Sequence, residues 1–181
     1  MQIVVFFIGS VPIIYFSWRS LGSMRNHGFF RFFAWEIMLW ILISNIPFWF
    51  KDPFSTHQLA SWILLCVSIW PVADSLYRFK VAGRISDERK DPSLFSFEHT
   101  TRLITSGVYR VIRHPMYAAL LYLNWGIALK NPSLIILAYA VLASVFLFLT
   151  VKTEEREDIA FFGDEYREYM KHTKMFVPWI W

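Results

Sequence analysis

The chain has 181 residues, of which 56% are hydrophobic and only 18% are charged. Soluble domains carry about 25% charged residues, so this composition argues against an ordinary soluble globule and against an intrinsically disordered chain. The net charge of +4 comes from basic residues that lie between apolar runs, which favours anionic lipid over nucleic acid as a partner. Because a membrane span needs about 20 apolar residues, the chain has room for a handful of spans and none for a separate Rossmann domain.

Five apolar segments follow one another along the chain, three in residues 1–79 and two in the C-terminal region, residues 80–181. We expect each to form a transmembrane helix, which gives an all-α integral membrane protein with five spans. The pair Asn131-Pro132 between the last two segments is a turn signal, and it predicts a tight helical hairpin. The expected ranges are residues 2–18, 32–50, 59–79, 116–129 and 134–151.

The composition changes after the fifth segment, where residues 152–174 are highly charged. Apolar and aromatic residues still recur there at helical spacing. This pattern predicts one amphipathic cytoplasmic helix that follows the hairpin and lies on the membrane surface or against the bundle. The predicted apolar stripe consists of Ile159, Phe162, Tyr166 and Tyr169.

Basic residues are distributed very unevenly between the two predicted sides of the membrane. Lys51 and Lys130 lie on one side, and the other sixteen of the 18 Lys and Arg residues lie on the opposite side. Because cytoplasmic loops carry an excess of Lys and Arg, the N-terminus is expected outside and the C-terminus in the cytoplasm. We expect a bacterial plasma membrane rather than the endoplasmic reticulum. The sixteen residues lie in segments 19–31, 78–113 and 152–174.

A polar loop over residues 103–117 runs straight into the fourth apolar segment. Gly107 permits a tight turn, and Pro115 stands where a helix would begin. Arg113 and His114 then flank a helix N-terminus, where free amides and the helix dipole favour an anion. The alternative is structural, with Arg113 as a membrane-surface anchor and His114 as a helix cap.

Two adjacent carboxylates, Glu154 and Glu155, follow the fifth segment. The hairpin returns to the face from which it started, so these carboxylates can meet Arg113 and His114 in space. A carboxylate pair beside an Arg-His pair suits a small polar ligand that carries hydroxyls, an ammonium or a sulfonium. The alternative is that the two acids only complement a helix dipole.

The two polar blocks on either side of the predicted hairpin form a recognisable pattern. The first, residues 106–117, contains the sequence Arg-His-Pro-Met-Tyr, and the second begins with Glu154-Glu155 and continues through residues 162–169. In this order they resemble the conserved blocks of the isoprenylcysteine carboxyl methyltransferase family, within a wider group that includes the phospholipid N-methyltransferases. The chain departs from that family at Ala119, where glycine is common.

The resemblance covers roughly residues 100–178 and implies an enzyme that uses S-adenosyl-L-methionine without a Rossmann domain. It implies methyl transfer to a lipophilic acceptor, most like the O-methylation of an isoprenylcysteine carboxyl group. Phospholipid N-methylation, an NADPH-dependent membrane reductase and a non-catalytic membrane protein that keeps the fold are the alternatives. The cofactor-binding residues that the resemblance implies are Tyr109, Arg113, His114, Pro115, Tyr117, Glu154 and Glu155.

The transfer step itself points to two catalytic candidates. We expect Arg156 to orient an anionic acceptor and Glu155 to bind the ribose or the amino group of the cofactor. Methyl transfer is an in-line displacement, so it depends more on alignment than on acid–base help. The histidines show no metal-ligand spacing, so no metal is expected. Asp74, near the cytoplasmic end of the third span, is expected to be structural.

Overall fold

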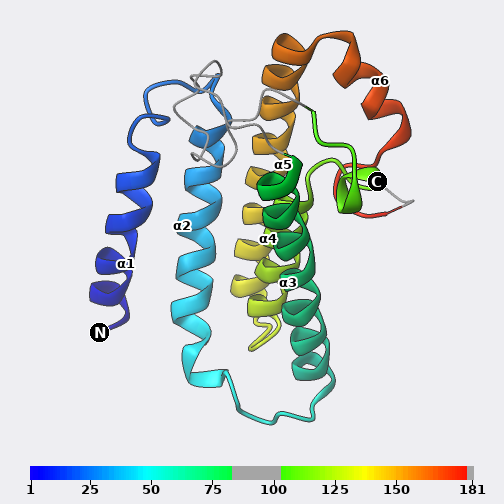
Figure 1. The fold of residues 1–181 in the computed structure, drawn as a ribbon. Coiled ribbons are helices and arrows are strands. Elements are labelled where there is room, and N and C mark those ends of the chain that lie inside the picture. Colours follow the sequence, from blue (N-terminus) through cyan, green and yellow to red (C-terminus); the bar gives the residue numbers. More distant parts are fainter. Residues whose placement is uncertain (83–102, 179–181) are drawn as a thin grey trace.

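The computed structural model describes residues 1–82 and 103–178, and in these ranges the regular elements are helices (Figure 1). One isolated β-bridge joins Ile112 to Lys174. The all-α prediction is therefore confirmed for the described part of the chain. The α-helices are α1 (Gln2–Ser17), α2 (His27–Asn45), α3 (Thr56–Ala82), α4 (Pro115–Ala128), α5 (Leu134–Phe162) and α6 (Asp164–His172), with short 3-10 helices η1 (Ile46–Phe48) and η2 (Gly107–Arg110).

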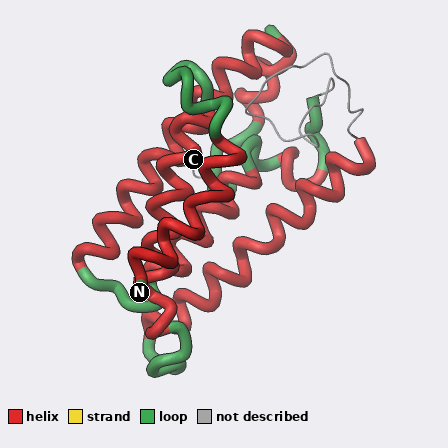
Figure 2. The backbone as a smooth tube through the Cα atoms, turned by 90° about the vertical axis from the view of Figure 1, so that its left-hand side faces the viewer, coloured by secondary structure: helices red, strands yellow, loops and turns green. Residues whose placement is uncertain are grey.

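The long helices run alongside one another in an order that differs from their order in the chain (Figures 1 and 2). α5 packs against α2 and α4, α3 packs mainly against α4, and α1 packs against α2. Fully buried alanines such as Ala34, Ala118 and Ala140 lie between these helices and allow the backbones to approach closely. As a result, α2, α4 and α5 form the middle of the bundle.

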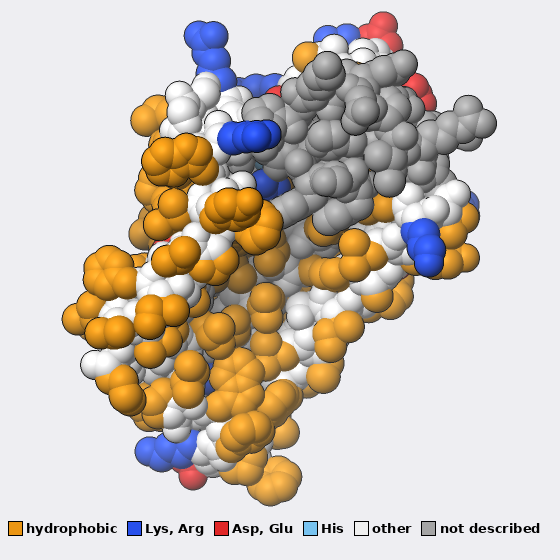
Figure 3. Space-filling model, turned by 60° about the vertical axis from the view of Figure 1, so that its left-hand side comes forward, with side chains coloured by type: hydrophobic (Ala, Val, Ile, Leu, Met, Phe, Trp, Pro, Cys, Tyr) orange, Lys and Arg blue, Asp and Glu red, His pale blue; other side chains and the backbone are white. Residues whose placement is uncertain are grey.

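Three helical stretches are long and apolar enough to cross a membrane, namely residues 27–48, 56–81 and 134–162. α1 and α4 are apolar but have only 16 and 14 residues. At about 1.5 Å per residue, neither reaches the roughly 30 Å of a bilayer core by itself. Figure 3 shows hydrophobic side chains over the middle of the molecule, with charged side chains mainly at its ends. All five predicted segments are helical, and their crossing of the membrane as five spans stays a prediction.

The predicted amphipathic helix is wrong in its start and in its length. α5 continues through the charged residues as far as Phe162, and the chain turns at Gly163, whose φ is +63°. α6 then has 9 residues, with Tyr166 and Tyr169 buried. Lys and Glu are good helix formers, so a change to charged composition at residue 152 does not end a helix. A glycine with a positive φ, which other residues rarely adopt, does end one.

The C-terminal end of α4 is held by side chains from α2 and α3. A helix leaves its last carbonyls without intrahelical donors, and an unpaired carbonyl is costly among apolar helices. Hydrogen bonds from the neighbouring helices supply donors here and fix the depth of α4 in the bundle. They join Asn45 Nδ2 to Ile127 O (2.8 Å), Ser61 Oγ to Gly126 O (2.6 Å), His57 Nδ1 to Leu129 O (3.0 Å) and Gln58 Nε2 to Lys130 O (3.1 Å).

Candidate active site

Polar side chains from four helices meet at the end of the bundle that holds α6 in Figure 1. α2 contributes its first turns, α4 its N-terminal end, α5 its last turns and α6 its buried face. Charged groups among apolar helices are unfavourable unless partners compensate them, so such a concentration marks a candidate functional site. We call this group the polar cluster; it consists of His27, Arg31, Arg113, His114, Tyr117, Glu154, Glu155, Glu157, Asp158 and Tyr166.

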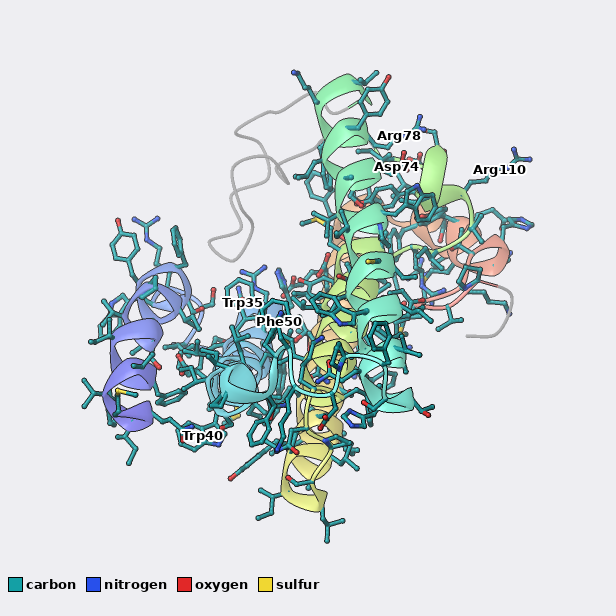
Figure 4. All side chains as sticks on the ribbon, turned by 90° about the horizontal axis from the view of Figure 1, so that it is seen from below. Trp35, Trp40, Phe50, Asp74, Arg78 and Arg110 are labelled. Carbon is teal, nitrogen blue, oxygen red and sulfur yellow. The ribbon has the colours of Figure 1, made fainter. Side chains whose placement is uncertain are left out.

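The turn that leads toward α4 is anchored on α3. Gly107 has a φ of +65°, and a Cβ there would lie 2.2 Å from Arg78 Nε and 2.5 Å from Asp74 Oδ2. The Asp74 carboxylate accepts a hydrogen bond from the Val108 N–H at 2.7 Å and one from Arg78 Nε at 3.3 Å. Figure 4 labels Asp74 and Arg78, which extend from α3 beside this turn. The expected structural role of Asp74 is therefore confirmed.

The segment between η2 and α4 is supported by the chain that follows α6. The Arg113 N–H donates to Lys174 O at 2.8 Å, and the Lys174 N–H donates to Val111 O at 2.9 Å. A third backbone bond, from the His114 N–H to Met175 O, is 3.3 Å long. These bonds hold Arg113 and His114 on a paired backbone rather than on a free loop.

Arg113 and Glu155 join the two sequence blocks directly. Arg113 Nε donates to Glu155 Oε1 at 2.6 Å, and Nη1 donates to Thr173 O at 2.8 Å. The other Glu155 oxygen accepts a hydrogen bond from Lys152 Nζ at 3.0 Å. Glu155 thus has a cation on each oxygen, and these bonds leave Nη2 of Arg113 for a further acceptor. The predicted meeting of the Arg-His pair with the glutamate pair is confirmed.

His114 is the N-cap residue of α4, but its side chain makes no capping hydrogen bond. Its Nε2 lies 3.3 Å from the Tyr166 hydroxyl and 3.7 Å from Glu155 Oε1, and its Nδ1 lies 4.0 Å from Glu154 Oε1. Burial and the nearby carboxylates raise the pKa of Tyr166 well above its usual range, so the hydroxyl keeps its proton as a donor. The alternative in which His114 acts only as a helix cap is wrong.

Glu154, one position earlier on α5, has different partners. Tyr117, whose ring centroid is 6.1 Å from that of His114, hydrogen-bonds to the Glu154 carboxylate. His27, Arg31 and His114 interact with the same carboxylate electrostatically. Its Oε2 is buried and has no hydrogen-bond partner among the described residues. Glu154 therefore offers an acceptor oxygen to a ligand.

The remaining predicted site residues, Tyr109, Pro115 and Arg156, take different positions. Pro115 is the first residue of α4, as expected. Tyr109 is buried in an apolar cluster, and its carbonyl accepts a hydrogen bond from the Tyr169 hydroxyl at 2.6 Å. Arg156 is exposed on α5, and within the described part of the chain no contact joins it to the polar cluster.

Comparison with known protein families shows where the chain belongs. The phospholipid methyltransferase family matches residues 56–165, which is more than half of the chain. The chain belongs to the phospholipid methyltransferase family. The matched residues run from the start of α3 to the start of α6. They include the first polar block and the second as far as Glu165, whereas α1 and α2 precede them.

The relatives of this chain are named as methyltransferases. Methanethiol S-methyltransferase 1 from Bradyrhizobium diazoefficiens is 22% identical over 177 residues, which cover 94% of this chain and 51% of that protein. Protein-S-isoprenylcysteine O-methyltransferase from Rattus norvegicus is 40% identical over 149 residues, or 70% of this chain and 51% of that protein. The human protein of that name is 41% identical over 85 residues, or 45% of this chain and 29% of that protein. The chain thus spans about half the length of these relatives or less, and no solved structure matches it.

Several members of the polar cluster were not predicted from the sequence. His27 carries no motif, and Arg31 counts only as a basic loop residue. Tyr166 belongs to the predicted apolar stripe and to the second polar block, but neither pattern predicts its contact with His114. His27 and Glu157 are 130 positions apart, and no local pattern pairs them. The one usable signal is Asn26, a favoured N-cap residue, which marks His27 as the first residue of a helix.

Proposed function

We propose that the chain is a membrane-embedded methyltransferase that uses S-adenosyl-L-methionine to methylate a lipophilic acceptor. The single observation that carries this proposal is the 2.6 Å bond between Arg113 and Glu155, which joins the two polar blocks inside one buried cluster. The family assignment and the names of the relatives support the same class of reaction.

The side chains present fit the chemistry of that cofactor, which carries a carboxylate, an ammonium, ribose hydroxyls and a sulfonium. Nη2 of Arg113 and the first-turn amides of α4 suit the carboxylate. The buried Oε2 of Glu154, without a partner among the described residues, suits the ammonium or a ribose hydroxyl. Because Arg113 and Lys152 already occupy both oxygens of Glu155, we assign the direct contact to Glu154 and the positioning of Arg113 to Glu155.

When bound, the cofactor supplies an electrophilic methyl group on its sulfonium. The chain supplies alignment, which is the main requirement of an in-line displacement. Tyr166 and Glu155 hold the His114 ring, and the backbone bonds to the segment after α6 hold Arg113. His114 and Glu155 are only 4% and 3% exposed, so they act where water is largely excluded and charges interact more strongly.

For the acceptor, we propose a lipophilic thiol. Glu154, Glu157 and Asp158 crowd the cluster with carboxylates, which would repel an anionic acceptor. A thiol approaches without charge and releases a proton on methylation, which a carboxylate or an imidazole of the cluster can take up. The relative that aligns with 94% of this chain is named for methanethiol, which is itself a thiol.

An isoprenylcysteine carboxylate is the second candidate acceptor. The 40% identity to the rat protein-S-isoprenylcysteine O-methyltransferase over 149 residues favours it. Its carboxylate would need a cation outside the acidic cluster. Arg156, exposed on α5, is the side chain that would orient it.

The acceptor class can be tested with membranes that contain the chain and with cofactor labelled in its methyl group. Octanethiol, N-acetyl farnesylcysteine and phosphatidylethanolamine are offered one at a time. We expect label in the thioether, loss of that label in Glu154→Gln, and unchanged transfer in Arg167→Gln, a control whose side chain is 59% exposed on α6. Label in the farnesylcysteine methyl ester would favour the second candidate. Absence of label in all three products, or NADPH oxidation in its place, would contradict the proposed function.

A further inference from the structure

His27 is the first residue of α2, and a single carboxylate from α5 binds it twice. Its backbone N–H donates to Glu157 Oε1 at 3.1 Å, and its ring Nδ1 lies 2.5 Å from Glu157 Oε2. The His27 side chain is 0% exposed, whereas that of Glu157 is 21% exposed. Asn26 caps the same helix end by accepting the Gly28 N–H at 2.8 Å. The ring of His27 therefore has a fixed position between α2 and α5.

This fixed ring also interacts with other members of the polar cluster. Because a carboxylate oxygen only accepts hydrogen bonds, Nδ1 of His27 carries the proton in the bond to Glu157. The other ring nitrogen, Nε2, is buried. His27 and Arg31 both interact electrostatically with Glu154, one helical turn before Glu157 on α5. α2 thus contributes two cationic or protonatable groups to the carboxylate assigned to the cofactor.

We propose that His27 is a positioning residue that orients the Glu154 carboxylate for the cofactor, and that Glu157 sets the orientation of His27. This inference rests on the proposed function, because it assumes that Glu154 contacts the cofactor. The family match covers residues 56–165. The inference extends the site beyond these residues to α2, which would line one side of it. A merely structural alternative is that the His27–Glu157 pair only ties α2 to α5.

Substitution of His27 by asparagine separates these two roles. The side-chain amide nitrogen of asparagine lies close to the position of Nδ1, so His27→Asn keeps a donor for Glu157 and removes the rest of the ring. The matched control is His172→Asn, because the His172 side chain is 74% exposed on α6. Glu157→Gln is a second variant that keeps an acceptor for the His27 N–H and removes the charge that holds the ring.

The measurement is calorimetric titration of the detergent-purified variants with S-adenosylhomocysteine, with thermal unfolding of each variant alongside. We expect His27→Asn to weaken binding about tenfold, because the Glu154 carboxylate loses the electrostatic interaction that orients it, with a melting temperature near that of the parent. Glu157→Gln should weaken binding less, and His172→Asn should not change it. In the transfer assay, the KM for the cofactor should rise in His27→Asn, with a much smaller change in kcat.

The binding results separate the role of His27 from the proposed function. Parent-like affinity in a folded His27→Asn variant would overturn the positioning role and leave the proposed function intact. The same holds if His27→Asn fails to fold and Glu157→Gln folds with parent-like affinity. A folded parent protein that does not bind S-adenosylhomocysteine would overturn the proposed function, and the role of His27 with it.

Discussion

Gly107 and Gly163 both have a positive φ, but the two positions tolerate a side chain to different degrees. Their φ angles are +65° and +63°, but only at Gly107 would an added Cβ meet neighbouring atoms within 4 Å. Those neighbours belong to the Asp74–Arg78 pair that anchors η2 on α3. The position of the Arg113 segment therefore depends on a residue without a side chain at position 107.

We predict that Gly107→Ala destabilises the protein more than Gly163→Ala. A positive φ costs an alanine about 1–3 kcal/mol at either position. Only at position 107 must the Asp74–Arg78 pair also move. Thermal unfolding of the two purified variants measures the difference, and equal melting temperatures would contradict the anchoring role of that pair.

The polar cluster was predictable where its members lie in two local blocks. Arg113 and His114 precede one helix of a predicted hairpin and Glu154 and Glu155 end the other, so their meeting follows from the topology. The different partners of Glu154 and Glu155 were not predictable. Neighbouring side chains point in directions about 100° apart around a helix, so they meet different neighbours. His27 was not predictable at all, since its contact depends on the packing of α2 against α5.

Among the helices, α4 depends most on its neighbours, because it is short and its end is buried. Gln58 is fully buried and donates from Nε2 to Phe48 O at 2.9 Å and to Lys130 O at 3.1 Å. Its Oε1 accepts a hydrogen bond from Lys130 Nζ, which also lies 3.4 Å from the ring centroid of Trp62. Burial lowers the pKa of Lys130, which shows the cost of holding its ammonium in this position.

We predict that Gln58→Leu lowers the free energy of unfolding by about 3 kcal/mol, because a buried ammonium and a carbonyl of the α4 end lose their partners. Thermal or denaturant unfolding in detergent measures the loss. Adding Lys130→Met to Gln58→Leu should restore part of the stability, since the uncompensated charge is removed. Strictly additive losses in the double variant would contradict the proposed coupling between the two side chains.

The presence of a helix was predictable for each of the five apolar segments, because each is an apolar run bounded by polar or turn-forming residues. The extent of α5 was not predictable from composition, because its last turns are charged on the outside and buried on the face that carries Glu155 and Asp158. The true break needs the backbone conformation of Gly163, which the sequence only permits.

At the scale of the whole molecule, the polar cluster and α6 lie at one end, and the N-terminus and the α2–α3 and α4–α5 connections lie at the other (Figure 1). The excess of basic residues on the cluster side predicts that this end faces the cytoplasm. A cytoplasmic site could receive a soluble cofactor from water and a lipophilic acceptor from the bilayer.

We predict the corresponding pattern of labelling by a membrane-impermeant maleimide in a Cys66→Ala background. Asn131→Cys, in the α4–α5 connection, should react in intact cells. Lys171→Cys, on the exposed face of α6, should react only after the cells are broken. Labelling of Lys171→Cys in intact cells would reverse the orientation, and protection of Asn131→Cys would contradict the passage of the hairpin through the membrane.

The central claim is that the polar cluster binds S-adenosylmethionine through Arg113. Calorimetric titration of the purified protein with S-adenosylhomocysteine, with NADPH titrated in parallel, tests it most directly. We predict binding of S-adenosylhomocysteine only, its loss in Arg113→Ala, and its retention in Arg110→Ala, which removes an exposed arginine three positions earlier in the chain. Equal affinity of Arg113→Ala and the parent protein, or binding of NADPH alone, would contradict the claim.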